Sequence, residues 1–389
     1  MRYAARMHRV KGEGAFAVLA RAKELEAQGK EVVHLQIGEP DFATPEHIQD
    51  AARQAMRDGY TKYGPAPGFL EVREAIAADV SASRGIPVDP DEVVVTTGAK
   101  PFLFFSALAL VDDGDEVIYP DPGFPIYESV IGLAGGKPVP VPLRQENEFR
   151  LDPEELASLA TDRTRLVILN SPQNPTGSVL TRDDLERIAE VCIAKDIMVL
   201  SDEPYSRVIY DGQHLSIASV PGMKERTILV DGFSKRYSMT GWRLGYGIMP
   251  KNLAENIALL QVNDTSCAPA FSQIAGMKAL QGPQDCVAEM VAKFKARRDL
   301  IVQGLNELPG VSCVMPKGAF YAFPDVHETG LDCEELAEAL LEEAGVALLA
   351  GTSFGRQGDG FLRLSYANSR ENIQKALTRM GDYLASARR

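Results

Sequence analysis

The chain has 389 residues, of which 45% are hydrophobic and 24% are charged, a composition ordinary for a globular enzyme. Its formal net charge of −13 argues against nucleic acid or an anionic membrane as a partner, because both attract basic surfaces. The first residues show no secretory signal, and no apolar run is long enough to span a membrane. We therefore expect a soluble, cytoplasmic protein.

The five cysteines are scattered without CxxC or CxxH spacing, and the five histidines form no HExxH motif. An odd, unpatterned set of cysteines is typical of a reducing compartment and predicts no disulfide framework. We also expect no metal site, because the residue spacing of a zinc site is missing.

Short apolar strands alternate with helical segments through the middle of the chain. A crossover helix is predicted at 182–194, between two of these strands. The alternation predicts a mainly parallel sheet covered by helices on both faces, which is an α/β fold. The predicted strands are 92–96, 116–119, 166–170, 198–202, 227–231 and 244–249.

The pattern changes after about residue 283 and predicts a smaller α+β domain. Its predicted helices are 287–308, 333–344 and a last one from residue 371, and its strand-like segments are 311–314, 319–323, 346–350 and 361–367. A helical pattern at 16–28 is expected to join this domain or to form an arm. The expected division is an N-terminal arm with part of the small domain (1–43), a large cofactor-binding domain (44–284) and a small C-terminal domain (285–389).

Polar side chains follow three consecutive strands of the predicted sheet. Asp202 ends one strand, and Tyr205 comes one short turn later. Lys235 and Arg243 follow the next strand, and Asn174 follows the preceding one. Because ligands of open parallel sheets bind beyond the carboxyl ends of the strands, we expect these side chains to surround one site.

A phosphate-binding turn is predicted where strand 92–96 runs into TGAKP. Gly98 allows a tight turn, and Pro101 suits the first turn of a helix. The turn formed by Gly98, Ala99 and Lys100 would then present free N–H groups at a helix N-terminus, which favours an anion. The Lys100 side chain is expected to point to solvent, so that only its backbone touches phosphate.

These groups match the requirements of pyridoxal phosphate. The cofactor needs an amine for a Schiff base, which Lys235 offers, and a carboxylate that keeps its ring nitrogen protonated, which Asp202 offers. Arg243 and the helix N-terminus can hold the phosphate. The expected ring contacts are Tyr205 and Asn174 at the phenolic oxygen and Phe124 on the ring face.

Six segments, taken in chain order over nearly the whole sequence, resemble those of class I/II aminotransferases of the aspartate aminotransferase superfamily, in their bacterial and archaeal branch. They are GEPDF (38–42), YGPAPG (63–68), SPQNPTG (171–177), SDEPY (201–205), FSKRYSMTGWRLGY (233–246) and LRLSYA (362–367). The resemblance implies a fold-type I homodimer with active sites at the subunit interface and pyridoxal 5'-phosphate as cofactor. It also implies amino-group transfer from an L-α-amino acid to an α-keto acid, either 2-oxoglutarate or pyruvate.

The resemblance assigns cofactor-binding and catalytic roles motif by motif. Lys235 matches the Schiff-base lysine and Asp202 the partner of the pyridine nitrogen. Asn174 and Tyr205 match the residues around the phenolic oxygen, and Arg243 matches the phosphate arginine. Lys235, Asp202 and Tyr205 are therefore the expected catalytic residues.

The resemblance also implies how the substrate is bound. Arg363 matches the arginine that grips the substrate α-carboxylate in two-point fashion. Gly38 matches the backbone position beside that carboxylate, and Asn174 is expected to contribute there as well. Tyr63 matches the tyrosine that reaches across the dimer to the phosphate of the other subunit.

Some positions depart from the family pattern. Gly232 stands where many relatives have a serine, and Ser234 is the candidate replacement for its phosphate contact. Phe124 stands where relatives often have tryptophan. No arginine occurs at 261–265, where some relatives bind an acidic side chain, and Glu13 lies in a stretch that lines the pocket in others. We therefore expect neutral amino donors to be preferred over aspartate.

Other functions stay open at this point. A β-lyase, a racemase or an oxidase would use the same cofactor residues on the same fold. A non-enzymatic regulator with this fold would need an added DNA-binding domain, for which no extension is visible. A NAD-dependent dehydrogenase is disfavoured because no GxGxxG follows a predicted strand.

Overall fold

Runs of apolar residues form the central sheet of the structure, a computed structural model that describes residues 3–387. The strand order is β2-β8-β7-β6-β5-β3-β4. Strand β8 is antiparallel to both of its neighbours, whereas the other paired strands are parallel. This arrangement confirms the mainly parallel sheet expected from the sequence. The strands are β2 (Val93–Thr96), β3 (Glu116–Asp121), β4 (Lys137–Pro142), β5 (Thr164–Asn170), β6 (Met198–Asp202), β7 (Thr227–Gly232) and β8 (Gly245–Ile248).

Strand β4 is absent from the strands expected from the sequence. Its residues, KPVPVP, alternate proline with other residues. Proline lacks an N–H group and is tolerated only where the ladder does not need one, as on an edge strand. Strand β4 occupies such a position, because it lies at the end of the sheet and pairs only with β3.

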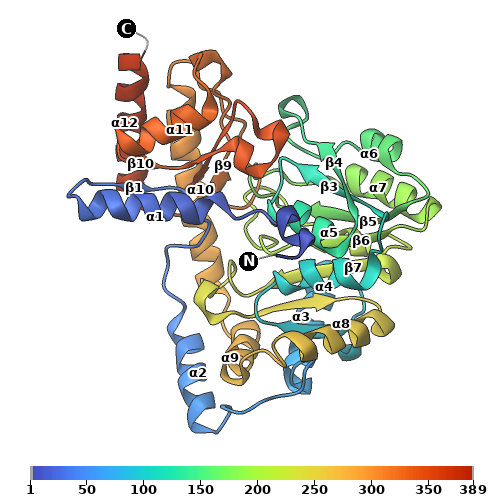
Figure 1. The fold of residues 1–389 in the computed structure, drawn as a ribbon. Helices are drawn as coiled ribbons and strands as arrows, with labels where there is room; N and C mark the ends of the chain where they lie inside the picture. Colours follow the sequence, from blue (N-terminus) through green and yellow to red (C-terminus); the bar gives the residue numbers. More distant parts are fainter. Residues whose placement is uncertain (1–2, 388–389) are drawn as a thin grey trace.

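Helices cover both faces of this sheet (Figure 1). Neighbouring residues of a strand point to opposite faces, and Val94 and Val95 of β2 accordingly belong to different hydrophobic clusters. Val95 packs with α2 (Glu46–Arg57), α3 (Leu70–Arg84) and α9 (Ala270–Gln281). Val94 packs with α4 (Pro101–Leu110), α5 (Ile126–Ala134) and α8 (Lys251–Asp264). Two further helices, α6 (Pro153–Leu159) and α7 (Arg182–Ala194), pack with Val167 and Leu169 of β5.

Local signals fix the ends of several helices. The predicted helix 182–194 is present as α7, and Thr181 begins it with a capping box. The Thr181 hydroxyl accepts from the Asp184 N–H, and the Asp184 carboxylate accepts from the Thr181 N–H. Gly85 ends α3 in the left-handed conformation, with a φ of 67°, which glycine adopts at little cost.

The smaller α+β domain lies to one side of the sheet (Figure 1). Its long helices bury a shared core that includes Phe294, Ile301 and Leu340. The predicted helices 287–308 and 333–344 end slightly earlier than expected, and the segment 311–314 forms no strand but only an isolated bridge from Ser312 to Asp325. The elements are α1 (Gly14–Ala27), β1 (Val33–His34), α10 (Asp285–Asn306), β9 (Tyr321–Ala322), α11 (Cys333–Glu342), β10 (Val346–Ala347), β11 (Leu349–Ala350), β12 (Leu362–Ser365) and α12 (Arg370–Ala387).

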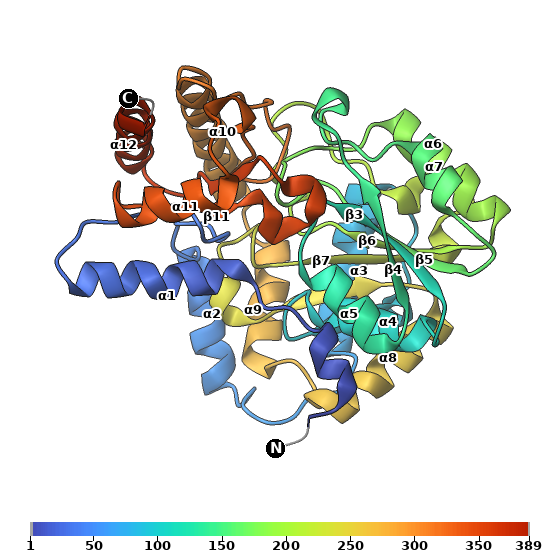
Figure 2. The ribbon, with the colours of Figure 1, turned by 45° about the horizontal axis from the view of Figure 1, so that its top comes forward.

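The N-terminal segment belongs to the smaller domain in space. Strand β1 pairs with β10 in parallel, and α1 buries Leu25 against Ala347. Arg21 of α1 forms an ion pair with Glu342 of α11 at 2.6 Å, so the two helices lie side by side (Figure 2). Within residues 3–387, no helix has the length and apolar content needed to cross a membrane.

Candidate active site

A cavity of about 850 Å³ lies at the carboxyl ends of the parallel strands, between the two domains. Lys235 and Asp202 of the large domain line it, and so do Tyr321 and Arg363 of the smaller domain. This is where an open parallel sheet is expected to bind its ligand. The volume is within the range of roughly 300–1,000 Å³ that is typical of small-molecule sites.

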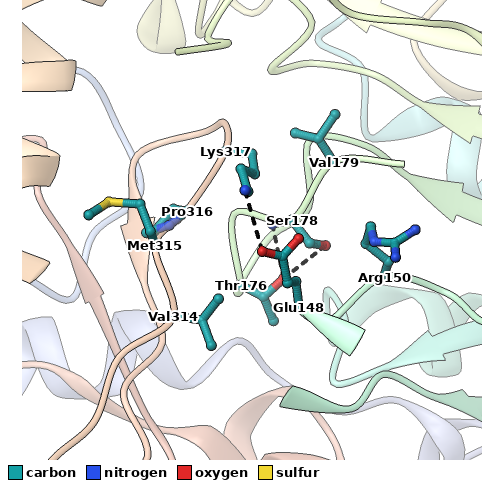
Figure 3. Close-up of a pocket in the computed structure, with 9 residues that line it drawn as sticks. All are labelled: Glu148, Arg150, Thr176, Ser178, Val179, Val314, Met315, Pro316 and Lys317. Carbon is teal, nitrogen blue, oxygen red and sulfur yellow. Dashed lines mark hydrogen bonds and ion pairs between the residues drawn. The ribbon is translucent and has the colours of Figure 1, made fainter. Parts of the chain in front are cut away.

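A second pocket lies away from these groups, where residues 148–150 and 176–179 meet residues 314–317 (Figure 3). Lys317 and Glu148 form an ion pair at 3.3 Å beside it. Its volume of about 10 Å³ has room for about one water molecule. It is therefore too small for an amino acid substrate.

Lys235 is a partly buried amine that follows the end of β7. Its Nζ donates a hydrogen bond to the backbone carbonyl of Gly38. The pKa of Lys235 is lowered to about 8, mainly by burial and also by the nearby cations Arg363 and Arg243, while Glu39 opposes the shift. A larger fraction of the amine is thus neutral near neutral pH than for an exposed lysine, and the neutral amine is the nucleophilic form.

Asp202 is a buried carboxylate at the end of β6. Tyr127 Oη donates a 2.6 Å hydrogen bond to its Oδ2, and Asn170 Nδ2 donates to its backbone carbonyl at 2.8 Å. Burial raises the pKa of Asp202 to about 7, and the hydrogen bond from Tyr127 opposes that rise. A buried anion of this kind is strongly stabilised by a protonated nitrogen placed beside it.

The turn between β2 and α4 has the form of an anion site. Gly98 has a φ of 89°, and a side chain at this position would collide with the guanidinium of Arg243. That guanidinium donates to the backbone carbonyls of Thr240 at 2.9 Å and Thr97 at 3.3 Å. Ala99 and Ser234 line the same cavity. A cation beside a helix N-terminus is a favourable seat for phosphate.

The sequence predicts that the Lys100 side chain points to solvent. In the structure, this side chain contacts other residues of the cavity instead. Its Nζ forms an ion pair with Glu13 and lies 5.3 Å from the centroid of the Phe124 ring. All three residues line the cavity. Phe124 itself contacts the ring of Tyr127 edge to face, with centroids 5.8 Å apart.

Arg363 on β12 is buried between two aromatic rings. Its guanidinium carbon lies 4.7 Å from the ring centroid of Tyr321 and 5.0 Å from that of Phe354. One Nη donates to the backbone carbonyl of Gln36, and the other lies 3.4 Å from Asn174 Oδ1. Within residues 3–387, the buried Arg363 Nε has no hydrogen-bond partner. A ligand carboxylate would satisfy this donor.

Two tyrosines belong to the site although no sequence motif indicated them. Tyr321 Oη shares a 2.7 Å hydrogen bond with Tyr205 Oη, and it also packs so closely on Gly38 that a side chain at position 38 would collide with it. Tyr127 holds Asp202. The only sequence signal was indirect, since Tyr321 lies within the predicted strand-like segment 319–323 and Tyr127 lies in the segment that follows predicted strand 116–119.

Most of the candidate residues line the cavity, and Gly98 packs against the lining residue Arg243, but Tyr63 lies elsewhere. Its side chain is 89% exposed, and the residue is not part of the cavity lining. The segment 261–265 is also not part of the lining, and the buried Gln261 instead donates to the backbone carbonyl of Val95 at 2.8 Å. In the described chain 3–387, no three or more His, Cys, Asp or Glu side chains gather in a way that could hold a metal ion.

The site thus combines a partly buried lysine of lowered pKa, a buried carboxylate and an anion-binding turn at the carboxyl ends of the strands. The unpaired Nε of Arg363 and the crowded turn at Gly98 suit a substrate carboxylate and a phosphate, so the residues fit pyridoxal phosphate and an amino acid. The fold and these groups define a pyridoxal-phosphate-dependent enzyme of fold type I.

Comparison with known proteins gives the family. The family described as aminotransferase class I and II matches residues 30–380. An aspartate aminotransferase of Pyrococcus abyssi is 45% identical over 92% of both chains, and aromatic-amino-acid aminotransferase 2 of Thermococcus litoralis is 44% identical over 91% of this chain and 92% of its own. The solved structure of the Thermus thermophilus aspartate aminotransferase with maleate is similar with a TM-score of 0.94, at 40% identity, covering 98% of this chain and 100% of that one.

The chain belongs to the class I and II aminotransferases. It is a pyridoxal-phosphate-dependent transaminase, as the resemblance of its motifs implied. The expected α/β fold with a large, mainly parallel sheet is confirmed by the solved relatives as well as by the structure.

Proposed function

We propose that this transaminase moves an amino group from an L-α-amino acid to 2-oxoglutarate or pyruvate through a Schiff base on Lys235. The observation that carries the proposal is the placement of the partly buried Lys235 and the buried Arg363 in one cavity. Lys235 offers an amine of lowered pKa, and Arg363 offers a guanidinium with an unpaired buried Nε among residues 3–387. The first suits bond formation and proton transfer, and the second suits an α-carboxylate.

The chain's own residues divide the remaining tasks. Asp202 holds the proton of the ring nitrogen, and Lys235 moves the proton at the substrate α-carbon. Bound pyridoxal phosphate supplies an electron sink for the charge that develops at that carbon. The proposed positions are Tyr205 and Asn174 at the phenolic oxygen, Phe124 on the ring face, Arg243, Gly98, Ala99, Ser234 and the backbone of Lys100 at the phosphate, and Gly38 and Asn174 beside Arg363 at the substrate carboxylate.

We further propose that the active form is a homodimer. The support is the exposure of Tyr63, whose side chain is 89% accessible in the single chain although its motif matches a phosphate-binding position. Several apolar side chains are exposed as well, including Leu259 and Val262. A second copy of the chain that covered Tyr63 would bring its hydroxyl to the neighbouring cofactor site.

We also propose a division of the chain into domains and a cytoplasmic location. The pairing of β1 with β10 supports an arm and partial small domain at 1–43, followed by the large domain at 44–284 and the small domain at 285–389. The five cysteines are all free of disulfides, which suits a reducing compartment such as the cytoplasm.

A donor panel tests the proposed reaction. Purified protein is incubated with single amino acids and either 2-oxoglutarate or pyruvate, and both the keto acid and the new amino acid are quantified. We expect borohydride to fix the cofactor on Lys235 and Lys235→Ala to lower turnover by at least on the order of 10²–10⁴-fold. Lys251→Ala is the control, because Lys251 pairs with Asp91 at the surface. Ammonia release or racemisation without transfer to a keto acid would contradict transamination.

A further inference from the structure

The ion pair between Glu13 and Lys100 joins two segments at the wall of the active-site cavity. Glu13 is the N-cap residue of α1, but its side chain makes no capping hydrogen bond. It reaches instead to the ammonium of Lys100, 87 residues away in the sequence. Both residues line the cavity, and Glu13 is the better buried, with 20% of its side chain exposed against 42% for Lys100.

Glu13 and Lys100 line the same cavity as Arg363, the proposed anchor of the substrate carboxylate. Burial lowers the pKa of the Arg363 guanidinium, and the negative charge of Glu13 is among the influences that oppose this shift. Glu13 also acts on the pKa of Tyr321, which burial raises. The carboxylate of Glu13 therefore acts electrostatically on the end of the cavity where an amino acid would bind.

Apolar side chains line the same cavity as this pair. Phe16, Leu19, Leu103, Leu349 and Phe354 all line the cavity. An uncharged side chain could bury against such a wall with a favourable hydrophobic contribution. A second carboxylate would instead meet a lysine whose charge Glu13 already neutralises, together with the repulsion of Glu13 itself.

We propose that Glu13 is a specificity-determining residue, which engages Lys100 in an ion pair and thereby selects substrates with uncharged side chains over dicarboxylates. The inference rests on the proposed transamination. Donor and acceptor occupy the same side-chain subsite in turn, so the selection applies to both halves of the reaction. Aspartate, glutamate and 2-oxoglutarate are disfavoured together, and leucine, phenylalanine and pyruvate are favoured.

The test compares Glu13→Gln with a matched control. The substitution keeps the size of the side chain and removes its charge. Glu26→Gln removes the same charge from the same helix and the same cavity lining, but Glu26 pairs with His34 at 2.9 Å and not with Lys100. We expect the ratio of kcat/KM for aspartate to that for leucine to rise about tenfold in Glu13→Gln, mainly through KM. The control should stay within about twofold of the parent ratio.

Binding without turnover gives a second readout. Succinate and 4-methylpentanoate are titrated into the holoenzyme, and the change in cofactor absorbance gives their dissociation constants. Glu13→Gln should bind succinate about tenfold more tightly, and 4-methylpentanoate, which has no second carboxylate, should gain much less. The double variant Glu13→Gln/Lys100→Gln should lose the gain, because its two side chains carry the same net charge of zero as the ion pair of the parent protein.

The outcomes separate the two proposals. If the parent protein exchanges amino groups with no donor, the proposed transamination fails. If it does exchange them, but Glu13→Gln leaves both the substrate ratio and succinate binding unchanged, only the role of Glu13 is overturned. The role is also overturned if Glu26→Gln gives the same gain, or if the gain persists in the double variant.

Discussion

Tyr127 Oη donates a 2.6 Å hydrogen bond to Asp202 Oδ2, and both side chains are buried. The pKa of Asp202 is raised to about 7, mainly by burial, and the anionic neighbours Asp231 and Glu203 contribute to the rise. The hydroxyl of Tyr127 opposes it. Tyr127 thus favours the ionised form of Asp202, which is the form that can hold a proton on the cofactor ring nitrogen.

Tyr127→Phe should shift the pH dependence of the enzyme. Without the hydroxyl, the pKa of Asp202 rises further, so a higher pH is needed to ionise the carboxylate. The acid limb of the kcat/KM profile should therefore move to higher pH, and kcat at pH 7 should fall about tenfold. Tyr119→Phe is the control, because Tyr119 lies on β3 of the same sheet and is not the donor of the hydrogen bond to Asp202 Oδ2. Superimposable profiles for Tyr127→Phe and the parent protein would contradict this role.

Asp202 should also destabilise the cofactor-free protein at neutral pH. Its pKa is 3.8 as an ordinary carboxyl and about 7 in the fold, so the folded state holds the proton more tightly than the unfolded chain. The favourable contribution of the protonated group is complete below about pH 4 and is lost as the pH rises to about 7. Asp202→Asn does not titrate and avoids this loss.

Urea unfolding of the two cofactor-free proteins at several pH values measures the effect. Between pH 4 and 7, the unfolding free energy of Asp202→Asn should gain roughly 2–4 kcal/mol relative to the parent. Added cofactor should narrow the difference, because the ring nitrogen supplies a positive partner to Asp202 only. A difference that does not change with pH would show that the carboxyl is not perturbed in the fold.

Subunit mixing tests the role of Tyr63 across a dimer. If Tyr63 serves the neighbouring site, a hybrid of Tyr63→Ala and Lys235→Ala subunits has one intact site and one doubly defective site. Random mixing should then restore about one quarter of the parent activity, since half of the dimers are hybrids and each has one working site. Lys235→Ala mixed with Arg243→Ala is the control, because both residues serve the same site within one subunit and no intact site forms. A fully active monomer in sedimentation would contradict the dimer.

The parallel strands and the polar residues at their ends could be predicted from the sequence. The apolar runs before Asp202 and Lys235 are buried on both faces, so their pattern alone indicates parallel strands, and topology then brings the two polar ends together. Strand β4 was missed because its prolines are typical of loops, and only its place at the sheet edge makes them compatible with a strand.

The partners of the predicted residues could not be found in the same way. Tyr127 contacts Asp202 and Tyr321 contacts Tyr205, in each case between segments distant in the sequence. A single tyrosine in the sequence does not indicate such a contact, because tyrosines are also buried in cores without a role in a site. The orientation of Lys100 likewise depends on Glu13, which belongs to another element. Such pairings arise from tertiary packing and leave no local pattern in the sequence.

Arg363 should set affinity for every substrate, because the group it is placed to bind is common to all amino acids. Its guanidinium lies against the rings of Tyr321 and Phe354, a stacking that lysine cannot reproduce. Arg363→Lys should therefore lose the two-point grip while keeping the charge, and Arg363→Ala should lose both. The alanine variant should lose roughly 30-fold to several thousand-fold in kcat/KM, since removing one partner of a buried charged pair costs roughly 2–5 kcal/mol.

The loss should be similar for alanine, leucine, phenylalanine and aspartate as donors, because the α-carboxylate is the same in each. Measuring kcat/KM for these four donors in both variants checks the expectation. Arg298→Lys is a matched control, since Arg298 is also a buried arginine stacked on a tyrosine, 4.7 Å from the ring centroid of Tyr210, but is not part of the cavity lining. It should leave the kcat/KM values nearly unchanged. A loss confined to aspartate would instead assign Arg363 to the substrate side chain, and the α-carboxylate would then need another anchor.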